Sequence, residues 1–365
     1  MHEADSVDPP EAALVRLGWD ERFATEFEPH RENGYSPARV TAEHRGTYIV
    51  VGEGGELGAE PSGKLRHDAL GRGDLPAVGD WVALQTRADE GRATIHAVLP
   101  RRTKFSRKAA WAATEEQVVA ANVDVVFIVS ALTAELSLRR LERYLTLAWE
   151  SGASPVVVLN KSDLCPDLDG AIAEVETVTF GVPVVITSAV TGEGLEELRS
   201  YVGDGRTVAL LGSSGVGKST LLNALSGRDV QRTAELRADG RGRHTTTHRE
   251  LVALPSGGLL LDTPGMRELQ LWSAADGFES TFDDIESLAA TCRFADCAHE
   301  SEPGCAVLEA ERSGTLPSER LASYRKLQRE LRALALRQDK RAAADERRRW
   351  RSLQRARRAD QKPGR

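Results

Sequence analysis

The segment from Gly212 to Ser219 reads GSSGVGKS, and its residue types and spacing suit the binding of a phosphate chain. It follows an apolar strand expected at 207–211 and opens a helix expected at 220–225. Glycines let backbone N–H groups wrap a β-phosphate, Lys218 neutralises the β and γ oxygens during transfer, and the Ser219 hydroxyl can ligate Mg²⁺. A Gly/Ser turn could match by chance, but the strand and helix around it favour a P-loop. The expected nucleotide contacts here are Gly212, Ser213, Ser214, Gly215, Val216, Gly217, Lys218, Ser219 and Thr220.

Two short motifs could read the base of a nucleotide. Asn160-Lys161-Ser162-Asp163 ends a strand expected at 155–159, and the Asp163 carboxylate can accept from both N1–H and the N2 amino group of guanine. Thr187-Ser188-Ala189 follows a strand expected at 182–186, where a backbone N–H could meet the guanine O6. Alone, the first motif also fits a helix N-cap turn and the second is a weak signal. The expected base contacts are Asn160, Lys161, Asp163, Ser188 and Ala189.

A fourth motif, Asp262-Thr-Pro-Gly265, follows an apolar strand expected at 258–261. A carboxylate at Asp262 would reach Mg²⁺ through water, and the N–H of Gly265 could sense a γ-phosphate. The base-reading motifs precede the P-loop in this chain, whereas an ordinary G domain begins with the P-loop. The order therefore predicts a circularly permuted GTPase, in which the segment after Gly265 leads out of the domain.

The first switch segment is expected between the P-loop and Asp262, where residues 240–247 read GRGRHTTT. Thr246 or Thr247 is expected to cap Mg²⁺ with GTP bound, and we place Thr246 beside Ser219 as a magnesium ligand. Met266 stands where a Ras-like switch has a water-orienting Gln, so unassisted hydrolysis should be slow. His244 is the candidate catalytic residue for positioning water, the alternative being that it only hydrogen-bonds within its loop or faces solvent.

Three cysteines and a histidine with short spacings favour a structural zinc site rather than a disulfide framework. All four positions of a tetrahedral ion would be filled by protein, which leaves none open for catalysis. The alternative is three unpaired cysteines in a reducing compartment. Cys165 has no partner nearby and is expected to be a small buried apolar residue. The expected zinc ligands are Cys292, Cys297, His299 and Cys305.

Composition sets the size and class of the protein. Its 365 residues predict two or three domains, and 41% apolar with 28% charged residues exclude global disorder. The apolar runs are too short for a membrane span, so no membrane contact is expected. Four cysteines, three of them clustered, favour a reducing compartment, and we expect a cytoplasmic protein that acts as a monomer. Charge is asymmetric: residues 325–365 carry a net +11 within a total of −7, which leaves −18 for the first 324 residues. A tail of this kind is a solvated helix, a disordered segment or a contact for a polyanion.

Periodicity divides the chain into a leader, a barrel, an α/β unit and a helical end. Short β-rich segments with Gly-rich turns at 40–98 predict a small antiparallel barrel, and alternating apolar strands and helices from 123 to 261 predict a parallel sheet. A long helical run is expected at 318–358. The expected boundaries are 1–35 for a partly flexible leader, 36–105 for the barrel, 106–275 for the GTPase domain and 276–365 for the zinc-binding domain with its basic helix.

Five cations lie between Arg101 and Lys108, with Phe105 and Trp111 nearby. They could follow a phosphate backbone while a ring stacks on a base. A solvated linker is an equal alternative.

Together these motifs resemble the ribosome small subunit-dependent GTPase A (RsgA) family over roughly residues 38–335. The resemblance implies an OB-fold barrel, a circularly permuted P-loop GTPase domain in a multidomain α/β chain, and a small helical zinc-binding C-terminal domain. It also implies the 30S ribosomal subunit and its 16S rRNA as partners, a role in late subunit maturation, and hydrolysis of GTP to GDP that the subunit stimulates. The expected cofactors are GTP/GDP, Mg²⁺ and one structural Zn²⁺.

Two other classes of function share the nucleotide motifs. One is a regulatory GTPase that acts on a protein partner, which the barrel, zinc site and basic tail disfavour. The other is a nucleic-acid-binding scaffold that holds GTP only as a structural ligand. Stimulation of hydrolysis without rRNA would favour the first class, and turnover measured with and without small subunits separates the second from an enzyme.

Overall fold

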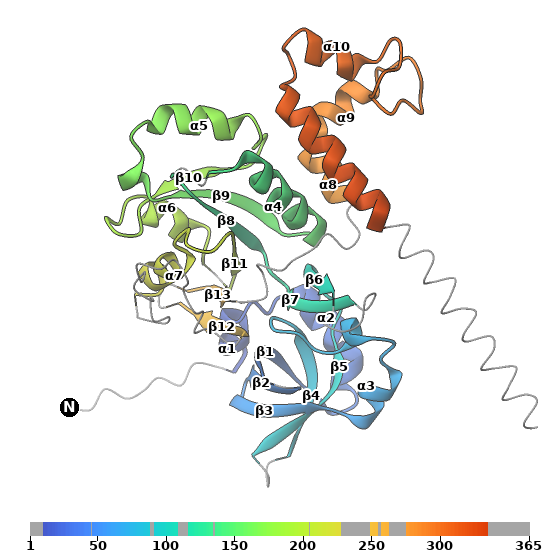
Figure 1. The fold of residues 1–365 in the computed structure, drawn as a ribbon. Helices are drawn as coiled ribbons and strands as arrows, with labels where there is room; N and C mark the ends of the chain where they lie inside the picture. Colours follow the sequence, from blue (N-terminus) through green and yellow to red (C-terminus); the bar gives the residue numbers. More distant parts are fainter. Residues whose placement is uncertain are drawn as a thin grey trace, which may run out of the picture.

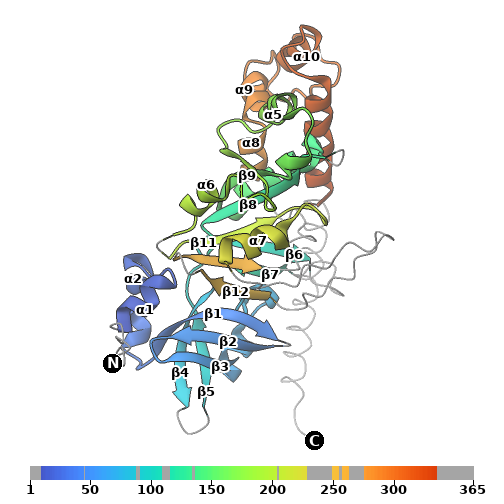
Figure 2. The same ribbon diagram turned by 90° about the vertical axis from the view of Figure 1, so that its left-hand side faces the viewer.

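A β-barrel and a group of C-terminal helices lie at opposite ends of a parallel sheet (Figures 1 and 2). This computed structural model describes residues 10–44, 46–87, 91–108, 116–133, 136–203, 205–227, 249–254, 257–262 and 275–334. None of the helices in these ranges is both long and apolar enough to cross a bilayer.

The barrel closes through five strands. They are β1 (Ser36–His44), β2 (Thr47–Gly52), β3 (Gly55–Pro61), β4 (Trp81–Arg87) and β5 (Arg92–Val98), with α3 (Gly63–Asp68) and η1 (Arg72–Asp74) between β3 and β4. The pairing runs β1–β2–β3–β5–β4 and returns to β1. The predicted barrel is confirmed, but its purely antiparallel character is wrong, because β3 pairs with β5 in parallel.

The N-terminal segment packs on this barrel through α1 (Pro10–Arg16) and α2 (Glu21–Arg31). Asp20 caps α2 by accepting from the backbone N–H of Phe23 at 3.2 Å. The helices bury an apolar cluster against the barrel, formed by Leu14, Phe23, Phe27, Trp81 and Leu99. Sequence analysis gave the segment no packing role, yet it covers the indole of Trp81.

Two of the cations between Arg101 and Lys108 make internal contacts that a solvated linker would not make. Arg101 holds the buried Asp80 with two 2.8 Å hydrogen bonds, and Arg102 lies over the ring of Phe23 at 4.1 Å. The rest of the segment forms β6 (Lys104–Lys108), which pairs with β7 (Glu116–Ala121). Arg101 thus stabilises the barrel, and Arg102 contacts α2.

The parallel sheet predicted for the α/β unit is confirmed. Its strands are β8 (Val125–Ala131), β9 (Ser154–Asn160), β10 (Val184–Thr187), β11 (Thr207–Leu211) and β13 (Leu259–Asp262), in the order β10–β9–β8–β11–β13. Alternate side chains of β8 enter different cores: Val126 and Ile128 face α4 (Leu138–Ser151), whereas Phe127 packs with residues of α6 (Leu195–Ser200) and α7 (Lys218–Ser226). Burial on both faces explains why these strands read as continuous apolar runs.

One strand that sequence analysis missed joins the sheet to the barrel. This strand, β12 (Arg249–Ala253), is antiparallel to β13 and also pairs with β1, where Ala42 lies opposite Glu250. In the described part of the chain the two sheets are therefore continuous (Figure 2).

The C-terminal helices pack on α4 rather than forming an isolated unit. They are α8 (Ala275–Thr281), α9 (Asp283–Ala289), α10 (Ala306–Arg312) and a helix over residues 318–334. Phe278, Phe282 and Tyr324 belong to the same core as Leu141 and Leu145 of α4. A buried Arg320 ties the region further by pairing with Glu142 of α4 at 2.8 Å and Asp284 at 2.7 Å. The helical run predicted from residue 318 is confirmed as far as residue 334, and its predicted continuation to 358 lies outside the described residues.

Candidate functional site

The carboxyl ends of four parallel strands bring the predicted nucleotide residues to one edge of the sheet. Asn160 ends β9, Thr187 ends β10, and the P-loop follows β11. Asp262 ends β13, the strand beside β11. Ligands of open α/β sheets bind at this edge, because the loops that leave neighbouring strands converge there.

Asn160 is the central contact of the site. Its Nδ2 donates to the carbonyl of Val216 in the P-loop at 2.8 Å, while its Oδ1 accepts from Thr187 Oγ1 and from the backbone N–H of Ala189, both at 3.2 Å. The side chain is 2% exposed. A single buried amide thus ties together three motifs that the sequence analysis treated separately.

The carboxylate of Asp163 is oriented for a base. It lies in η3 (Ser162–Leu164) on the exposed side of the loop, and its Oδ1 accepts from the buried hydroxyl of Ser188 at 2.7 Å. Lys161 precedes it in the left-handed conformation with φ 66°. The hydroxyl of Ser162 stabilises the loop by donating to the carboxylate of Glu193 at 2.6 Å. An exposed carboxylate with a fixed rotamer suits two convergent N–H donors of a guanine ring.

The P-loop has the backbone shape that a phosphate cradle needs. Gly215 and Gly217 have φ of 82° and 98°, and α7 begins directly afterwards at Lys218. The ammonium group of Lys218 donates to the carbonyls of Gly212 at 2.7 Å and Ser213 at 2.5 Å. Ser219 and Thr220 lie half-buried in the first turn of α7. The helix N-terminus, its backbone N–H groups and the lysine together favour an anion here.

Replacement of Gly217 by Ala should weaken GTP binding about 10- to 100-fold. A Cβ atom there would lie 2.3 Å from Asn160 Nδ2, at a left-handed φ that costs about 1–3 kcal/mol for other residues. Titration calorimetry with GTP measures the effect. Gly227→Ala is the matched control, since Gly227 also has a positive φ but has nothing within 4 Å of an added Cβ. Equal GTP affinity in the two variants would contradict a role for the close approach.

Two side chains that sequence analysis missed also reach the P-loop. Arg140 Nη1 donates to Ser213 Oγ at 3.0 Å, and the hydroxyl of Tyr144 lies 3.5 Å from the same oxygen. Both lie on one face of α4, four residues apart. The sequence holds only part of this signal: α4 follows the carboxyl end of β8, so its first turns lie at that edge of the sheet, but no motif shows that β8 is the neighbour of β11.

The predicted switch residues His244, Thr246, Thr247, Gly265 and Met266 lie outside the described residues. Their roles stay predictions.

The predicted metal ligands converge in the C-terminal region. The ligand atoms of Cys292, Cys297, His299 and Cys305 all lie within 4.8 Å of one another. The Sγ atoms of Cys292 and Cys305 are 3.8 Å apart, and His299 Nδ1 is 3.4 Å from the latter. Zn–S bonds of about 2.3 Å in a tetrahedron separate two sulfurs by about 3.8 Å. The cluster therefore fits a zinc ion, and all four cysteines of the chain are without disulfides.

The backbone conformation and the burial of these side chains favour metal binding. His299 adopts φ 58°, which is uncommon outside glycine and aims its ring at the thiols. Burial lowers the pKa of His299, which favours the neutral ring that a metal requires. Burial raises the pKa of Cys292, but backbone hydrogen bonds from Ala306 and Val307 outweigh it and hold the pKa below its usual value. Cys165 lies apart from the cluster, half-buried against the main core.

Comparison with known proteins identifies the family. The RsgA GTPase family model matches residues 98–272. The chain is 51% identical over 356 residues to the small ribosomal subunit biogenesis GTPase RsgA of Opitutus terrae, covering 95% of this chain and 97% of that protein. It is 48% identical over 341 residues to the protein of that name from Streptomyces avermitilis, covering 92% and 90% of the two chains.

Solved structures agree in fold. The crystal structure of YjeQ from Thermotoga maritima is 32% identical, with a TM-score of 0.61 over 81% of this chain and 98% of that one. YloQ, described as a circularly permuted GTPase, is 26% identical, with a TM-score of 0.60 over 82% and 96%. The predicted permutation, barrel and helical end with its Cys₃His cluster are confirmed, and the alternative in which GTP is only a structural ligand is wrong. The chain belongs to the RsgA family of circularly permuted GTPases and hydrolyses GTP.

Proposed function

We propose that this GTPase binds the 30S ribosomal subunit through 16S rRNA and acts late in the maturation of that subunit. The bound subunit stimulates the hydrolysis of GTP by this protein. The observation that carries the proposal is the likeness to proteins named small ribosomal subunit biogenesis GTPases over more than nine-tenths of the chain. The predicted domain boundaries near residues 35, 105 and 275 form part of the proposal. A cytoplasmic monomer is the form in which we expect it to act.

In this proposal the nucleotide residues divide into three tasks. Asp163, Ala189 and their neighbours select guanine, and Lys218 with the P-loop backbone binds and neutralises the phosphates. Ser219 and Thr246 would hold Mg²⁺, which Asp262 would reach through water, and the ion shields phosphate charge when bound. Cys292, Cys297, His299 and Cys305 would hold Zn²⁺, which stabilises the C-terminal region and takes no part in hydrolysis.

The connections of the sheet support stimulation by a partner. The strand that follows the first switch segment, β12, pairs with β1 of the barrel, and β13, which leads to Asp262, pairs with β12. A partner bound to the barrel can therefore bias both strands that lead to the predicted switches. A ligand shifts such an equilibrium only through contacts that differ between the two states.

The test is single-turnover hydrolysis of GTP with and without purified small subunits. A slow rate alone and a much faster rate with subunits are expected, because Met266 cannot orient water. A fast rate without subunits, or a rate that subunits leave unchanged, would overturn the proposal. Stimulation by a protein partner in the absence of ribosomal RNA would favour the regulatory alternative.

His244→Ala should lose about 100-fold of the stimulated rate, the lower end of what a positioned general base contributes. GTP affinity and subunit affinity should stay as in the wild type, whereas Lys218→Ala should disturb GTP binding itself. The control is His67→Ala, on an exposed imidazole of α3 in the barrel. A stimulated rate in His244→Ala equal to that of the control would show that His244 has no role in catalysis.

A further inference from the structure

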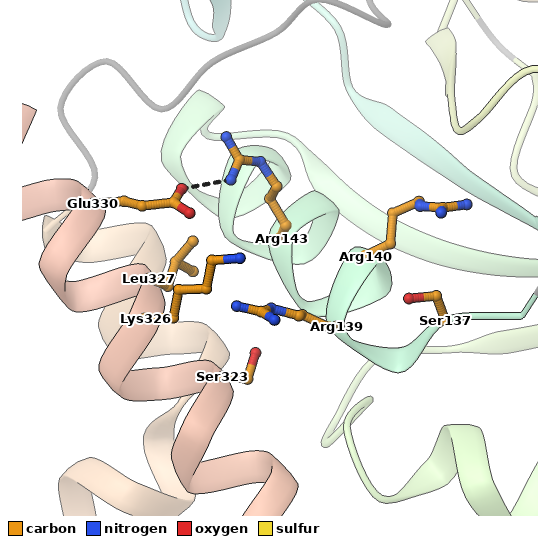
Figure 3. Close-up of a pocket in the computed structure, with 8 residues that line it drawn as sticks. All are labelled: Ser137, Arg139, Arg140, Arg143, Ser323, Lys326, Leu327 and Glu330. Atoms are coloured by element: carbon orange, nitrogen blue, oxygen red, sulfur yellow. Dashed lines mark hydrogen bonds and ion pairs between the residues drawn. The ribbon is translucent and has the colours of Figure 1, made fainter.

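A basic cleft lies between α4 and the C-terminal helix over residues 318–334 (Figure 3). Its volume is about 240 Å³, and both helices supply its lining. Arg139 and Arg143 come from α4, while Lys326 and Glu330 come from the C-terminal helix. We call this feature the α4 cleft.

The α4 cleft holds more positive than negative charge. Arg143 pairs with Glu330 at 2.6 Å, which neutralises one cation. Arg139 and Lys326 are both exposed, and Figure 3 shows that they point into the same space from opposite helices. Among the described residues neither has a carboxylate within ion-pairing distance. Two like charges that converge without a counterion repel each other, and an anion between them attracts both and outweighs that repulsion.

The helix dipole adds to this preference. Arg139 and Arg140 lie in the first turn of α4, where no acidic residue is present. The N-cap residue Ser137 lines the cleft, and its side chain caps none of the described backbone N–H groups. Cations at a helix N-terminus are unfavourable and anions favourable. The dipole of a 14-residue helix therefore favours the same ligand as the two converging cations.

The chemistry of the lining identifies the class of anion. Among the lining residues only Leu327 is apolar, so the cleft offers no platform for a base or for the body of a small molecule. Long, exposed cationic side chains around an open cleft suit a phosphodiester group in the backbone of a nucleic-acid strand. The C-terminal helix continues in sequence into residues 335–365, which carry 12 Lys and Arg against 4 Asp and Glu. This excess of positive charge in the sequence also favours a polyanion as the partner.

We propose that the α4 cleft binds a backbone phosphate of RNA, with Arg139 and Lys326 as its main contacts. The proposal rests on the proposed ribosomal function and names one RNA contact for it. The contact lies one residue from Arg140, whose guanidinium donates to Ser213 of the P-loop at 3.0 Å. RNA bound in the α4 cleft would therefore fix the turn of α4 that touches the phosphate loop.

The test compares the full-length double variant Arg139→Glu/Lys326→Glu with wild type in binding a fluorescent single-stranded RNA, by anisotropy at several salt concentrations. Affinity at low salt should fall about 10-fold, and the slope of log K against log salt should shrink by about 1, as expected for one lost phosphate contact. The control is Arg329→Glu, on an exposed residue of the same helix that does not line the cleft. Both changed side chains are exposed, so circular dichroism and GTP affinity should match wild type.

An affinity and a salt slope equal to wild type would overturn the proposal, as would an equal loss in Arg329→Glu. Phosphorus NMR with inorganic phosphate tests the other source of this anion: phosphate binding that the double variant loses, with unchanged RNA binding, would also overturn it. Small subunits as a second probe separate the two proposals. RNA binding that depends on the α4 cleft, together with no subunit binding by wild type, would leave the cleft assigned and refute the ribosomal function.

Discussion

Loss of metal from the cluster of Cys292, Cys297, His299 and Cys305 is expected to unfold the loop between α9 and α10 and leave the nucleotide site intact. Binding free energy of a structural zinc, about 10–16 kcal/mol in small zinc peptides, is folding free energy for the segment that supplies the ligands. The effect should stay local, because Phe278, Phe282 and Tyr324 also pack with Leu141 and Leu145 of α4 in the main core. Cys305 also accepts from the backbone N–H of Leu308, so α10 should fray with the loop.

Metal analysis of protein purified without chelator should find one zinc per chain, and hydrogen exchange after chelation should show lost protection between residues 290 and 312 only. Cys305→Ser should behave like the chelated protein. Cys165→Ser is its matched control, because Cys165 is the one cysteine outside the cluster. Protein without zinc, or equal zinc content in the two variants, would contradict the assignment.

Most of the G domain could be predicted because its signals are local. Each motif follows an apolar strand, and strands buried on both faces read as short apolar runs bounded by Gly or polar residues. The order of motifs then fixed the permutation. By contrast, β3 reads GELGAEP, which has neither β-branched residues nor alternation, and only its pairing with β2 and β5 makes it a strand.

Contacts between distant segments carried no comparable signal. The pairing of Ala42 with Glu250 joins strands some two hundred positions apart, and β12 follows directly on a segment that the Thr and Arg residues marked only as a switch. Nor could the sequence show that Arg101 would be held by a buried Asp80 instead of facing a nucleic acid. Basic residues look alike in sequence, and their partners decide whether they are structural or available to a ligand.

In the nucleotide site, too, the motifs could be predicted from the sequence, but the contacts between them could not. Asn160 was predicted from its motif, but its part in joining three loops depends on the geometry of Val216, Thr187 and Ala189 around it. Arg140 was missed because α4 has no motif. Its position follows only once β8 and β11 are known to be neighbours in the sheet.

Asp163→Asn should reduce GTP affinity by about 3–6 kcal/mol, or roughly 10²- to 10⁴-fold, because two charge-assisted hydrogen bonds to guanine N1–H and N2 are lost at about 1.5–3 kcal/mol each. The substitution should leave the loop in place, since an amide oxygen at this position can still accept from Ser188 Oγ. The loss would then report on base recognition alone.

Nucleotide competition sharpens this test. Xanthosine triphosphate carries a carbonyl where guanine carries the N2 amino group, and the amide N–H₂ of the Asp163→Asn variant can donate to it. The variant should therefore bind xanthosine triphosphate more tightly than GTP, the reverse of wild type. Asp169→Asn, the same change on an exposed carboxylate of α5 (Leu168–Glu176), should keep the wild-type order. Unchanged GTP affinity in Asp163→Asn would refute the role of this carboxylate. So would wild-type binding of ATP as tight as that of GTP, because a site that pairs two N–H donors must discriminate against bases that lack them.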